Sequence, residues 1–395
     1  MTNEFETLSP KSSLRRSRSG AALALVLLLV VAMAVVSLSG CKKKAPVVVN
    51  QPATETTTTA ETTPVAAPLV WPFTGLPADT VEETRQRPLS IKIENSALAR
   101  PQKGLNRADI VYETIAEGGI TRFNCIFQSN IPKEVGPVRS ARLSDCWIVP
   151  QYGQPLFFYS GSNSQVSKRL KKYKIARLYH GKLGTPTYHR VSFRSAPHNL
   201  YLTLSSIYKV AEKKGYKTAK TTDYKGLAYA DRTVVNNGVE SATDTYVANQ
   251  EQDLAQASTE TTATKVTIPF STYFKMSWKW DAEKGYWKRY TNGKKHKDGI
   301  DNKQVHAVNV VVMWAKYTLQ NKKDPAGNGT YDITLGGSGK CSVFVHGKRI
   351  NGTWEATRDA PPVFKDENGN EIKLDPGNTW FEVPPKNIKI KVAKS

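Results

Sequence analysis

The stretch "PLSIKIENS", Pro88 to Ser96, alternates apolar and polar residues. A period of two residues is typical of a β-strand. Two later stretches, "ITRFNCIFQS" and "PLFFYSGS", also have the composition of strands, and the second runs into a glycine turn. The sequence around Pro88 is therefore predicted to form part of a sheet.

Two other stretches of this region carry helical or ambiguous patterns. "SSIYKVAEKKGY" places Ile207, Val210 and Ala211 on one helical face and ends at Gly215, which predicts a helix. "NRADIVYETIAEGG" ends in a glycine pair, and its apolar residues fit a short helix or an extended segment equally well. Residues 69–240 are thus predicted to form a mixed α/β domain.

The C-terminal part of the chain is different, because short aromatic and β-branched runs alternate with glycine turns. Three Asn-Gly pairs predict hairpins, at Asn292-Gly293, Asn351-Gly352 and Asn368-Gly369. Residues 241–264 lose this apolar density and are predicted to be an interdomain loop. The expected fold class is α+β: a mixed α/β N-terminal domain, followed by a mainly antiparallel β C-terminal domain over residues 265–395.

Six of the eight tryptophans lie in this second domain. Interleaved with Lys and Arg, they fit a face that stacks on sugars or binds a polyanion. The pattern is more typical of a sheet whose tryptophans fill the core while lysines line the solvent side, as alternation predicts for any half-exposed sheet.

The N-terminus has the features of an export signal. A basic segment with Arg15 and Arg16 precedes the apolar run from Ala21 to Val36, which is shorter than the ~20 residues that span a bilayer. The following "LSGC" resembles the lipobox of bacterial lipoproteins. That resemblance implies that residues 1–40 are a lipoprotein signal peptide and that Cys41 is lipidated. The alternative is a plain transmembrane anchor.

Residues 41–68 are rich in Thr, Pro, Ala and Glu and have no period that could bury a face, which predicts a disordered tether. Lys42 to Lys44 stand beside the expected lipid, where basic side chains are attracted to anionic headgroups. The chain is therefore expected on the outer face of the cytoplasmic membrane, held there by its lipid anchor.

The net charge of +22 limits the classes of partner. Outside the cytoplasm no nucleic-acid partner is expected, and the available polyanions are lipid headgroups, anionic wall polymers and peptidoglycan. The basicity could also set solubility alone.

No cofactor or metal is expected. Besides Cys41, the three cysteines Cys125, Cys146 and Cys341 have no metal-binding spacing, and the histidines are scattered. Pairing of Cys125 with Cys146 stays open.

An arginine-rich constellation carries the functional hypotheses. "GPVRSAR" places Arg139 and Arg142 around Ser140, and Arg122 adds a third guanidinium on a predicted strand. Such a cluster needs negative charge, either from an external carboxylate or phosphate or from internal carboxylates. The internal candidates are Asp109, Glu113, Glu117 and Asp145. The sequence favours a ligand role for Arg142 and a bracing role for Arg139, which follows the Gly-Pro turn.

Three more polar residues are candidates. His198 in "RSAPHNLY" could act as a general base. It could equally join Asn199 in capping a helix that begins near Leu200. Ser160 follows an apolar strand, where an exposed nucleophile could sit. The candidate ligand-binding residues are therefore Glu113, Glu117, Arg122, Arg139, Ser140, Arg142, Ser160, His198 and Asn199, and no catalytic residue is assigned.

Long motifs also carry a family resemblance. "RPLSIKIENSALARPQKGLNRADIVYETIAEGGITRF", "GPVRSAR", "APHNLY" and "YWKRYTNGKKHKDG" resemble the YerB-type lipoprotein family, also labelled DUF3048. The resemblance implies a lipid-anchored envelope protein with two domains, and it implies no reaction.

Three hypotheses of function follow from these observations. The first is a non-enzymatic envelope lipoprotein that binds an anionic or glycan wall ligand or a partner protein. The second is a hydrolase or transferase acting on a wall polymer, with His198 working alongside Glu113 or Glu117. The third is a structural envelope assembly factor. An arginine cluster without a clear nucleophile and base pair favours the first.

Overall fold

The computed structural model describes residues 68–230, 260–323 and 327–394. The predicted signal peptide, Cys41, almost all of the tether and the interdomain loop up to residue 259 lie outside these residues. The chain from Val65 to Ser395 belongs to one compact unit. No helix of the described ranges combines the length and the apolar composition that crossing a bilayer requires.

The helices of the described residues are short. The α-helices are α1 (Val81–Arg85), α2 (Asp145–Gln151), α3 (Ser164–Lys172), α4 (His180–Leu183) and α5 (Ile207–Lys213), and the 3-10 helices are η1 (Ala97–Ala99) and η2 (Leu105–Arg107). The strands of the N-terminal part are β1 (Leu89–Glu94), β2 (Ile110–Ile115), β3 (Thr121–Phe127), β4 (Glu134–Val135), β5 (Leu156–Tyr159), β6 (Ala176–Tyr179), β7 (Tyr188–Arg190) and β8 (Leu200–Thr203).

Short strands dominate the C-terminal part of the chain. They are β9 (Thr261–Thr262), β10 (Lys265–Pro269), β11 (Lys275–Asp281), β12 (Tyr286–Thr291), β13 (Lys294–Lys295), β14 (His306–Ala307), β15 (Asn309–Met313), β16 (Lys316–Lys323), β17 (Gly329–Thr334), β18 (Gly337–Val345), β19 (Lys348–Ala356), β20 (Val363–Asp366), β21 (Thr379–Val383) and β22 (Lys391–Ala393).

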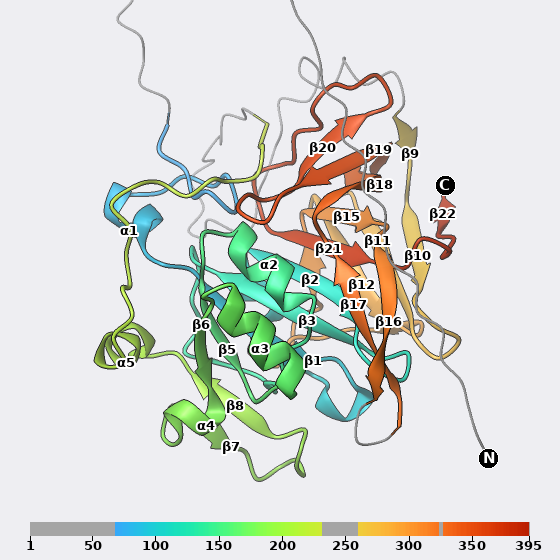
Figure 1. The fold of residues 1–395 in the computed structure, drawn as a ribbon. Coiled ribbons are helices and arrows are strands. Elements are labelled where there is room, and N and C mark those ends of the chain that lie inside the picture. The colour runs from blue at the N-terminus through green and yellow to red at the C-terminus, as the bar shows by residue number, and fades with distance from the viewer. Residues whose placement is uncertain (1–67, 231–259, 324–326, 395) are drawn as a thin grey trace, which may run out of the picture. The chain divides into compact units, whose positions relative to one another are not determined.

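One large sheet of 11 strands takes members from both parts of the chain, in the order β20-β19-β18-β15-β21-β2-β3-β1-β5-β6 with β9 beside β19 (Figure 1). β21 pairs in parallel with β15 on one side and with β2 on the other. A second sheet, β13-β12-β11-β10-β22 with β14 beside β12, is antiparallel. The α+β class is confirmed, and the two predicted domains contribute strands to one shared sheet.

The alternation in β1 has an unexpected consequence, because all six residues of the strand are buried. Its apolar residues enter the main core. Its polar residues face a second buried layer, where Lys92 pairs with Asp145 at 2.8 Å and both side chains are fully buried. Asn124 also donates a 2.9 Å hydrogen bond to Asp145. Lys92 therefore holds α2 against the sheet instead of facing solvent.

The tryptophans of the C-terminal part mainly fill the core. Trp278, Trp287 and Trp380 are among the largest fully buried side chains, and Trp354 is 2% exposed. α2 and α3 cover one face of β5, where Val149 and Leu170 pack near Phe157. The prediction of a tryptophan-filled sheet interior is confirmed.

Three local expectations are settled or corrected. The ambiguous stretch at residues 110–115 is the strand β2. No helix begins at Leu200, because residues 200–203 form the strand β8, paired with β7 and β4. The pair Asn351-Gly352 makes no turn and lies inside β19, where a side chain at Gly352 would collide with the carbonyl group of Lys365 on β20.

The turn between β18 and β19 is formed by His346 and Gly347, both with positive φ. The predicted turn at Asn292-Gly293 is confirmed: both residues have positive φ, and the pair joins β12 to β13.

Separate expression of residues 65–230 and 260–395 tests the shared sheet. We expect neither piece to unfold cooperatively alone, because β2 without β21 exposes an edge and the buried Tyr112 and Ile110. Mixing the unfolded pieces and refolding them together should give a one-to-one complex, detected by size-exclusion chromatography and circular dichroism. Cooperative thermal unfolding of the isolated N-terminal piece would contradict the shared core.

Candidate functional site

The candidate site lies at the edge of the large sheet where parallel strands end. β1 runs parallel to β5, and both β1 and β2 pair antiparallel with β3, so their carboxyl ends share one edge. Glu94 closes β1, Glu117 follows β2 and Ser160 follows β5. Ligands of open α/β sheets commonly bind outside such carboxyl ends. We call this group of residues the carboxyl-edge site.

The segment that carries the arginine pair crosses this edge and is hydrogen-bonded on both sides. The Arg139 amide donates to the Lys92 carbonyl at 2.8 Å, and the Arg139 carbonyl accepts from the Ser160 amide at 3.0 Å. The Ala141 amide donates to the Gly161 carbonyl at 2.9 Å. The backbone from 139 to 141 is therefore held between the ends of β1 and β5, and its side chains have fixed origins.

Glu117 organises one half of the site and is 7% exposed. Arg142 reaches it through Nε and through a 2.7 Å hydrogen bond from Nη2 to Oε2. Arg122 adds an ion pair at 3.1 Å. Nη1 of Arg142 also donates to the carbonyls of Ser140 and Ala141 at 3.1 and 2.9 Å. Arg142 is thus committed to bracing the edge.

Glu94 organises the other half. Its Oε1 lies 2.8 Å from Nδ1 of His198 and accepts a 2.8 Å hydrogen bond from Ser96. A carboxylate accepts, so Nδ1 of His198 is the donor in this contact, and in the neutral ring the lone pair is then on Nε2. Nε2 has no hydrogen-bond partner among the residues that the structure describes. This His–carboxylate arrangement fixes both the tautomer and the orientation of the ring.

Arg139 differs from the other two arginines. Its Nε lies 3.5 Å from Oε2 of Glu94, and its side chain makes no hydrogen bond within the described part of the chain. The side chain is 22% exposed. Its guanidinium therefore has unused donors at a partly buried position. The bracing contacts favoured for Arg139 are thus made by Arg142, and it is Arg139 that keeps donors unused.

Two hydroxyls lie next to the Arg139 segment, and the loop after the second one leads to a helix start. Ser140 and Ser160 are 3.2 Å apart at Oγ. The loop after Ser160 leads into α3, which is capped by a 2.9 Å hydrogen bond from the Val166 amide to Asn163. A cavity of about 430 Å³ adjoins the first turn of this helix, against residues 319–321 of β16. Backbone amides at a helix start attract negative charge.

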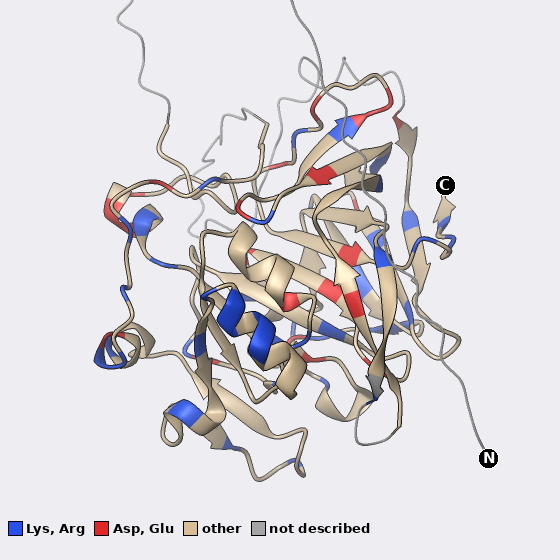
Figure 2. Cartoon of the chain, in the orientation of Figure 1, with Lys and Arg blue, Asp and Glu red and all other residues tan. Residues whose placement is uncertain are grey.

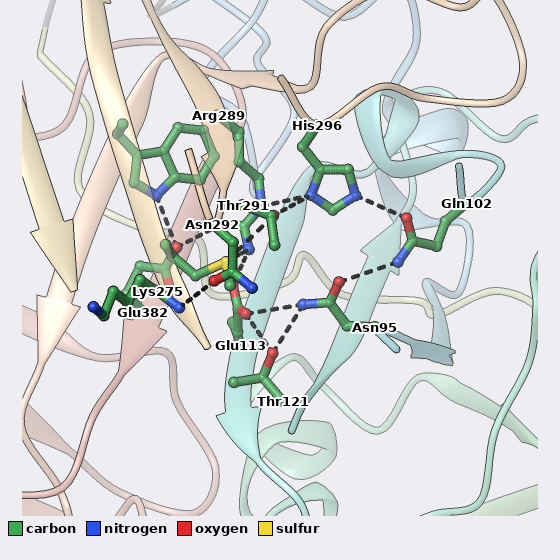
Figure 3. A network of polar contacts seen from close by, with 12 residues as sticks. Asn95, Gln102, Glu113, Thr121, Lys275, Arg289, Thr291, Asn292, His296 and Glu382 are labelled. Atoms are coloured by element: carbon green, nitrogen blue, oxygen red, sulfur yellow. Dashed lines mark hydrogen bonds and ion pairs between the residues drawn. The ribbon is translucent and has the colours of Figure 1, made fainter. Parts of the chain in front are cut away.

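Glu113 lies elsewhere, in the buried polar network of Figure 3. It accepts hydrogen bonds from Arg289 at 2.6 Å and from Asn95 at 3.1 Å, and it is fully buried. Arg289 also donates to Glu382 at 2.8 Å. Burial and the neighbouring Glu113 raise the pKa of Glu382 well above its usual value. Glu113 is a structural residue in this arrangement and does not reach the carboxyl edge.

Asn199 is also structural. Its side chain donates to the carbonyls of Val191 and Arg194 at 3.2 and 3.0 Å and accepts from Arg190 at 2.7 Å. It ties the loop before β8 together, and the expected helix cap is absent because no helix follows.

The sequence reasoning missed Glu94 and Ser96, although both stand in the opening stretch "IENS". The available signal was the position of Glu94 near the end of a predicted strand, two residues before the hydroxyl of Ser96. The pairing of Glu94 with His198 could not be predicted, because 104 residues separate them in the sequence.

The described ranges contain neither a metal-binding cluster nor an exposed thiol. No cluster of three or more His, Cys, Asp or Glu side chains suited to a metal ion occurs there. Cys125, Cys146 and Cys341 are free and buried, so the Cys125–Cys146 bridge does not form. Burial raises the pKa of the Cys341 thiol to about 12, far from the reactive thiolate range.

The two arginines predict opposite stabilities when each is replaced by glutamine. Arg142→Gln leaves the nearly buried Glu117 with fewer partners, and we expect a loss of about 3 kcal/mol in the free energy of unfolding. Arg139→Gln removes no hydrogen bond, and we expect a change within about 0.5 kcal/mol. Urea unfolding followed by circular dichroism measures both. Equal losses would contradict this division of roles.

Comparison with known proteins agrees with the fold. Residues 73–217 match the family described as "Protein of unknown function (DUF3048) N-terminal domain", and residues 266–381 match its C-terminal domain. A Bacillus subtilis (strain 168) protein described as "Putative lipoprotein YerB" is 30% identical over 319 residues, which cover 80% of this chain and 86% of that protein.

A solved structure gives the same result. The crystal structure of YerB protein from Bacillus subtilis superposes with a TM-score of 0.67 at 27% identity, covering 82% of this chain and 99% of that chain. The two family matches reach across both parts of the large sheet. This chain therefore belongs to the DUF3048 family and is a YerB-like protein.

Proposed function

We propose that this chain is a lipid-anchored envelope protein that binds an anionic group of a wall ligand at the carboxyl-edge site. The anchor is Cys41, in the "LSGC" sequence that follows the apolar run. The description of the Bacillus subtilis relative as a "Putative lipoprotein" supports the anchoring. The lipid would hold the folded unit at the membrane surface, within reach of wall polymers.

The single observation that carries the binding proposal is the state of Arg139. A guanidinium has five N–H donors, and leaving them unused at a partly buried position costs solvation. Arg122 and Arg142 share Glu117, whereas Arg139 has only a 3.5 Å ion pair with Glu94. A carboxylate or phosphate oxygen beside Arg139 would complete its hydrogen bonding.

The neighbouring groups complement an anion in the same place. The hydroxyls of Ser140 and Ser160 can donate to it, and the start of α3 contributes a positive electrostatic potential. The three arginines and two carboxylates leave one positive charge at the edge before His198 is counted. The basic residues of the chain, several of which Figure 2 shows along α3, would attract anionic wall polymer or peptidoglycan toward this edge.

A hydrolase or transferase acting on a wall polymer is the second candidate, and one observation favours it. The Glu94–His198 pair leaves Nε2 as a positioned proton acceptor, which general-base catalysis requires. The carboxylate partner is Glu94 and not Glu113 or Glu117, since Glu113 pairs with Arg289 and Glu117 pairs with two arginines.

Binding to purified wall fragments tests the proposal. We expect Arg139→Gln to weaken binding by at least tenfold without loss of stability, and Arg139→Lys to recover part of the affinity. The matched control is Arg85→Gln, which removes the same charge from an exposed pair with Asp223. Equal effects of Arg139→Gln and Arg85→Gln would refute a specific site.

The same assay separates the two candidates. Pure binding predicts that His198→Gln leaves the wall fragments intact, as the unmodified protein does. Release of shortened fragments by the unmodified protein, lost in His198→Gln, would establish the hydrolase.

The anchor has its own test. We expect Cys41→Ala to abolish incorporation of a labelled fatty acid and to leave a precursor of higher mass, because cleavage before Cys41 depends on its modification. Mass spectrometry and metabolic labelling measure the two effects. A lipidated Cys41→Ala protein would contradict the proposed anchor.

A further inference from the structure

A second cavity, of about 480 Å³, lies between the segment that follows β1 and the β12–β13 hairpin. One wall is formed by Ala97, Arg100 and Pro101, and the other by residues 291, 292 and 294–297 together with Asn302. It shares no lining residue with the carboxyl-edge site. We call it the cationic cavity.

We propose that the cationic cavity binds a phosphate ester group, through Arg100 and the three hairpin lysines Lys294, Lys295 and Lys297. This is a ligand site additional to the one at the carboxyl edge, and it does not depend on the function proposed there.

The charge of the lining is the first argument. Four of the ten lining residues are Arg or Lys, and none is Asp or Glu. None of these four cations forms an ion pair with a described residue, although many other basic side chains of the same unit do. Like charges gathered around one hollow raise its positive potential and concentrate anions there.

The second argument is that Arg100 is held in place. Its Nη2 donates to the Asn95 carbonyl at 2.8 Å, its Nε lies 3.3 Å from the Asn95 side-chain oxygen, and its guanidinium stacks over Phe274 at 5.1 Å. Its Nη1 donates no hydrogen bond within the described ranges. Burial and the nearby Arg289 lower the pKa of Arg100 to about 10, so the group stays charged at neutral pH. A cation that is already oriented binds an anion more tightly, because no side chain has to be ordered on binding.

The back wall of the cavity is rigid and uncharged. His296 is 2% exposed, and its Nδ1 accepts from Nε of Arg289 at 3.1 Å, so the ring proton is on Nε2 and is donated to Gln102 at 2.8 Å (Figure 3). Burial and Arg289 lower the pKa of His296 well below its usual value, which keeps the ring neutral. The positive charge of the cavity therefore comes from Arg100 and from the lysines at its opening.

These features identify the class of ligand. A volume of about 480 Å³ falls in the range of small-molecule sites and exceeds what a lone inorganic phosphate needs. One planar guanidinium and three flexible ammonium groups suit an anion with several oxygens and more than one charge. A phosphate ester meets both conditions, either on a soluble polymer or on a lipid headgroup.

Binding measurements on the Val65–Ser395 unit, which is compact on its own and lacks Lys42 to Lys44, test the proposal. The probes are inorganic pyrophosphate, soluble poly(glycerol phosphate), and vesicles of equal parts phosphatidylcholine and phosphatidylglycerol. The variant combines Lys294→Gln, Lys295→Gln and Lys297→Gln. The control combines Lys213→Gln, Lys214→Gln and Lys217→Gln, which removes the same charge from exposed positions in and after α5.

We expect the hairpin variant to weaken pyrophosphate binding by roughly tenfold or more, and the control to weaken it less than about twofold. Unfolding temperatures should match, since the replaced lysines are exposed. Arg100→Lys gives a second readout, with reduced affinity and a retained charge. If the unmodified protein binds only the polymer or only the vesicles, and the hairpin variant loses that binding, the phosphate ester comes from that source.

Three results would overturn the proposal: no binding of any probe, equal losses in the hairpin and control variants, or binding abolished by Arg139→Gln alone. The last result would leave the carboxyl-edge proposal standing while removing this one. Loss of wall-fragment binding in Arg139→Gln with normal pyrophosphate binding would instead show two separate sites.

Discussion

Arg289 makes the contact on which the rest of the structure depends. This fully buried arginine of β12 pairs with Glu113 of β2 and Glu382 of β21, at 2.6 and 2.8 Å (Figure 3). Its guanidinium also lies over the rings of Phe123, Trp278 and Trp380. A buried charge is tolerated only where its partners are close and well oriented. The arrangement therefore fixes how the antiparallel second sheet sits on the large sheet.

The same network links the two places that carry functional hypotheses. Asn95 donates to Glu113 and follows Glu94, the carboxylate that holds His198. On the other side, Gln102 and His296 connect the network to the back wall of the cationic cavity. The candidate site and the cationic cavity are thus both connected to one buried hydrogen-bonded network.

Local pattern predicted much of the sheet but little of its pairing. The strands β1, β3 and β5 follow from their apolar content, and the Asn292-Gly293 turn follows from backbone preference. The strand β2 was ambiguous because its state is decided by β3 and β21, and β21 begins more than 260 residues later. The Asn351-Gly352 pair has the composition of a hairpin turn. What requires glycine at position 352 is the close backbone of Lys365 on the neighbouring strand, and the Asn-Gly pair itself gives no sign of that contact.

The candidate site shows the same division. Arginine, histidine and serine were recognisable by residue type, and the carboxyl edge brings Arg122, Arg139, Arg142, Ser140, Ser160 and His198 together. Their internal partners could not be assigned, since Glu94 and Glu117 are joined to them only by folding. Local position in a turn therefore did not reveal which arginine pairs closely with a carboxylate.

The place of β21 in the sheet also constrains the order in which the chain can fold. β2 and β15 stand on either side of a gap that only residues 379–383 can fill, close to the C-terminus. While a ribosome is still making the chain, the centre of the sheet stays open until residues 379–383 have emerged. Contacts between such distant segments slow folding. A chain built in this way keeps two open strand edges in its unfinished sheet until that strand has been made, and such edges can pair with other chains.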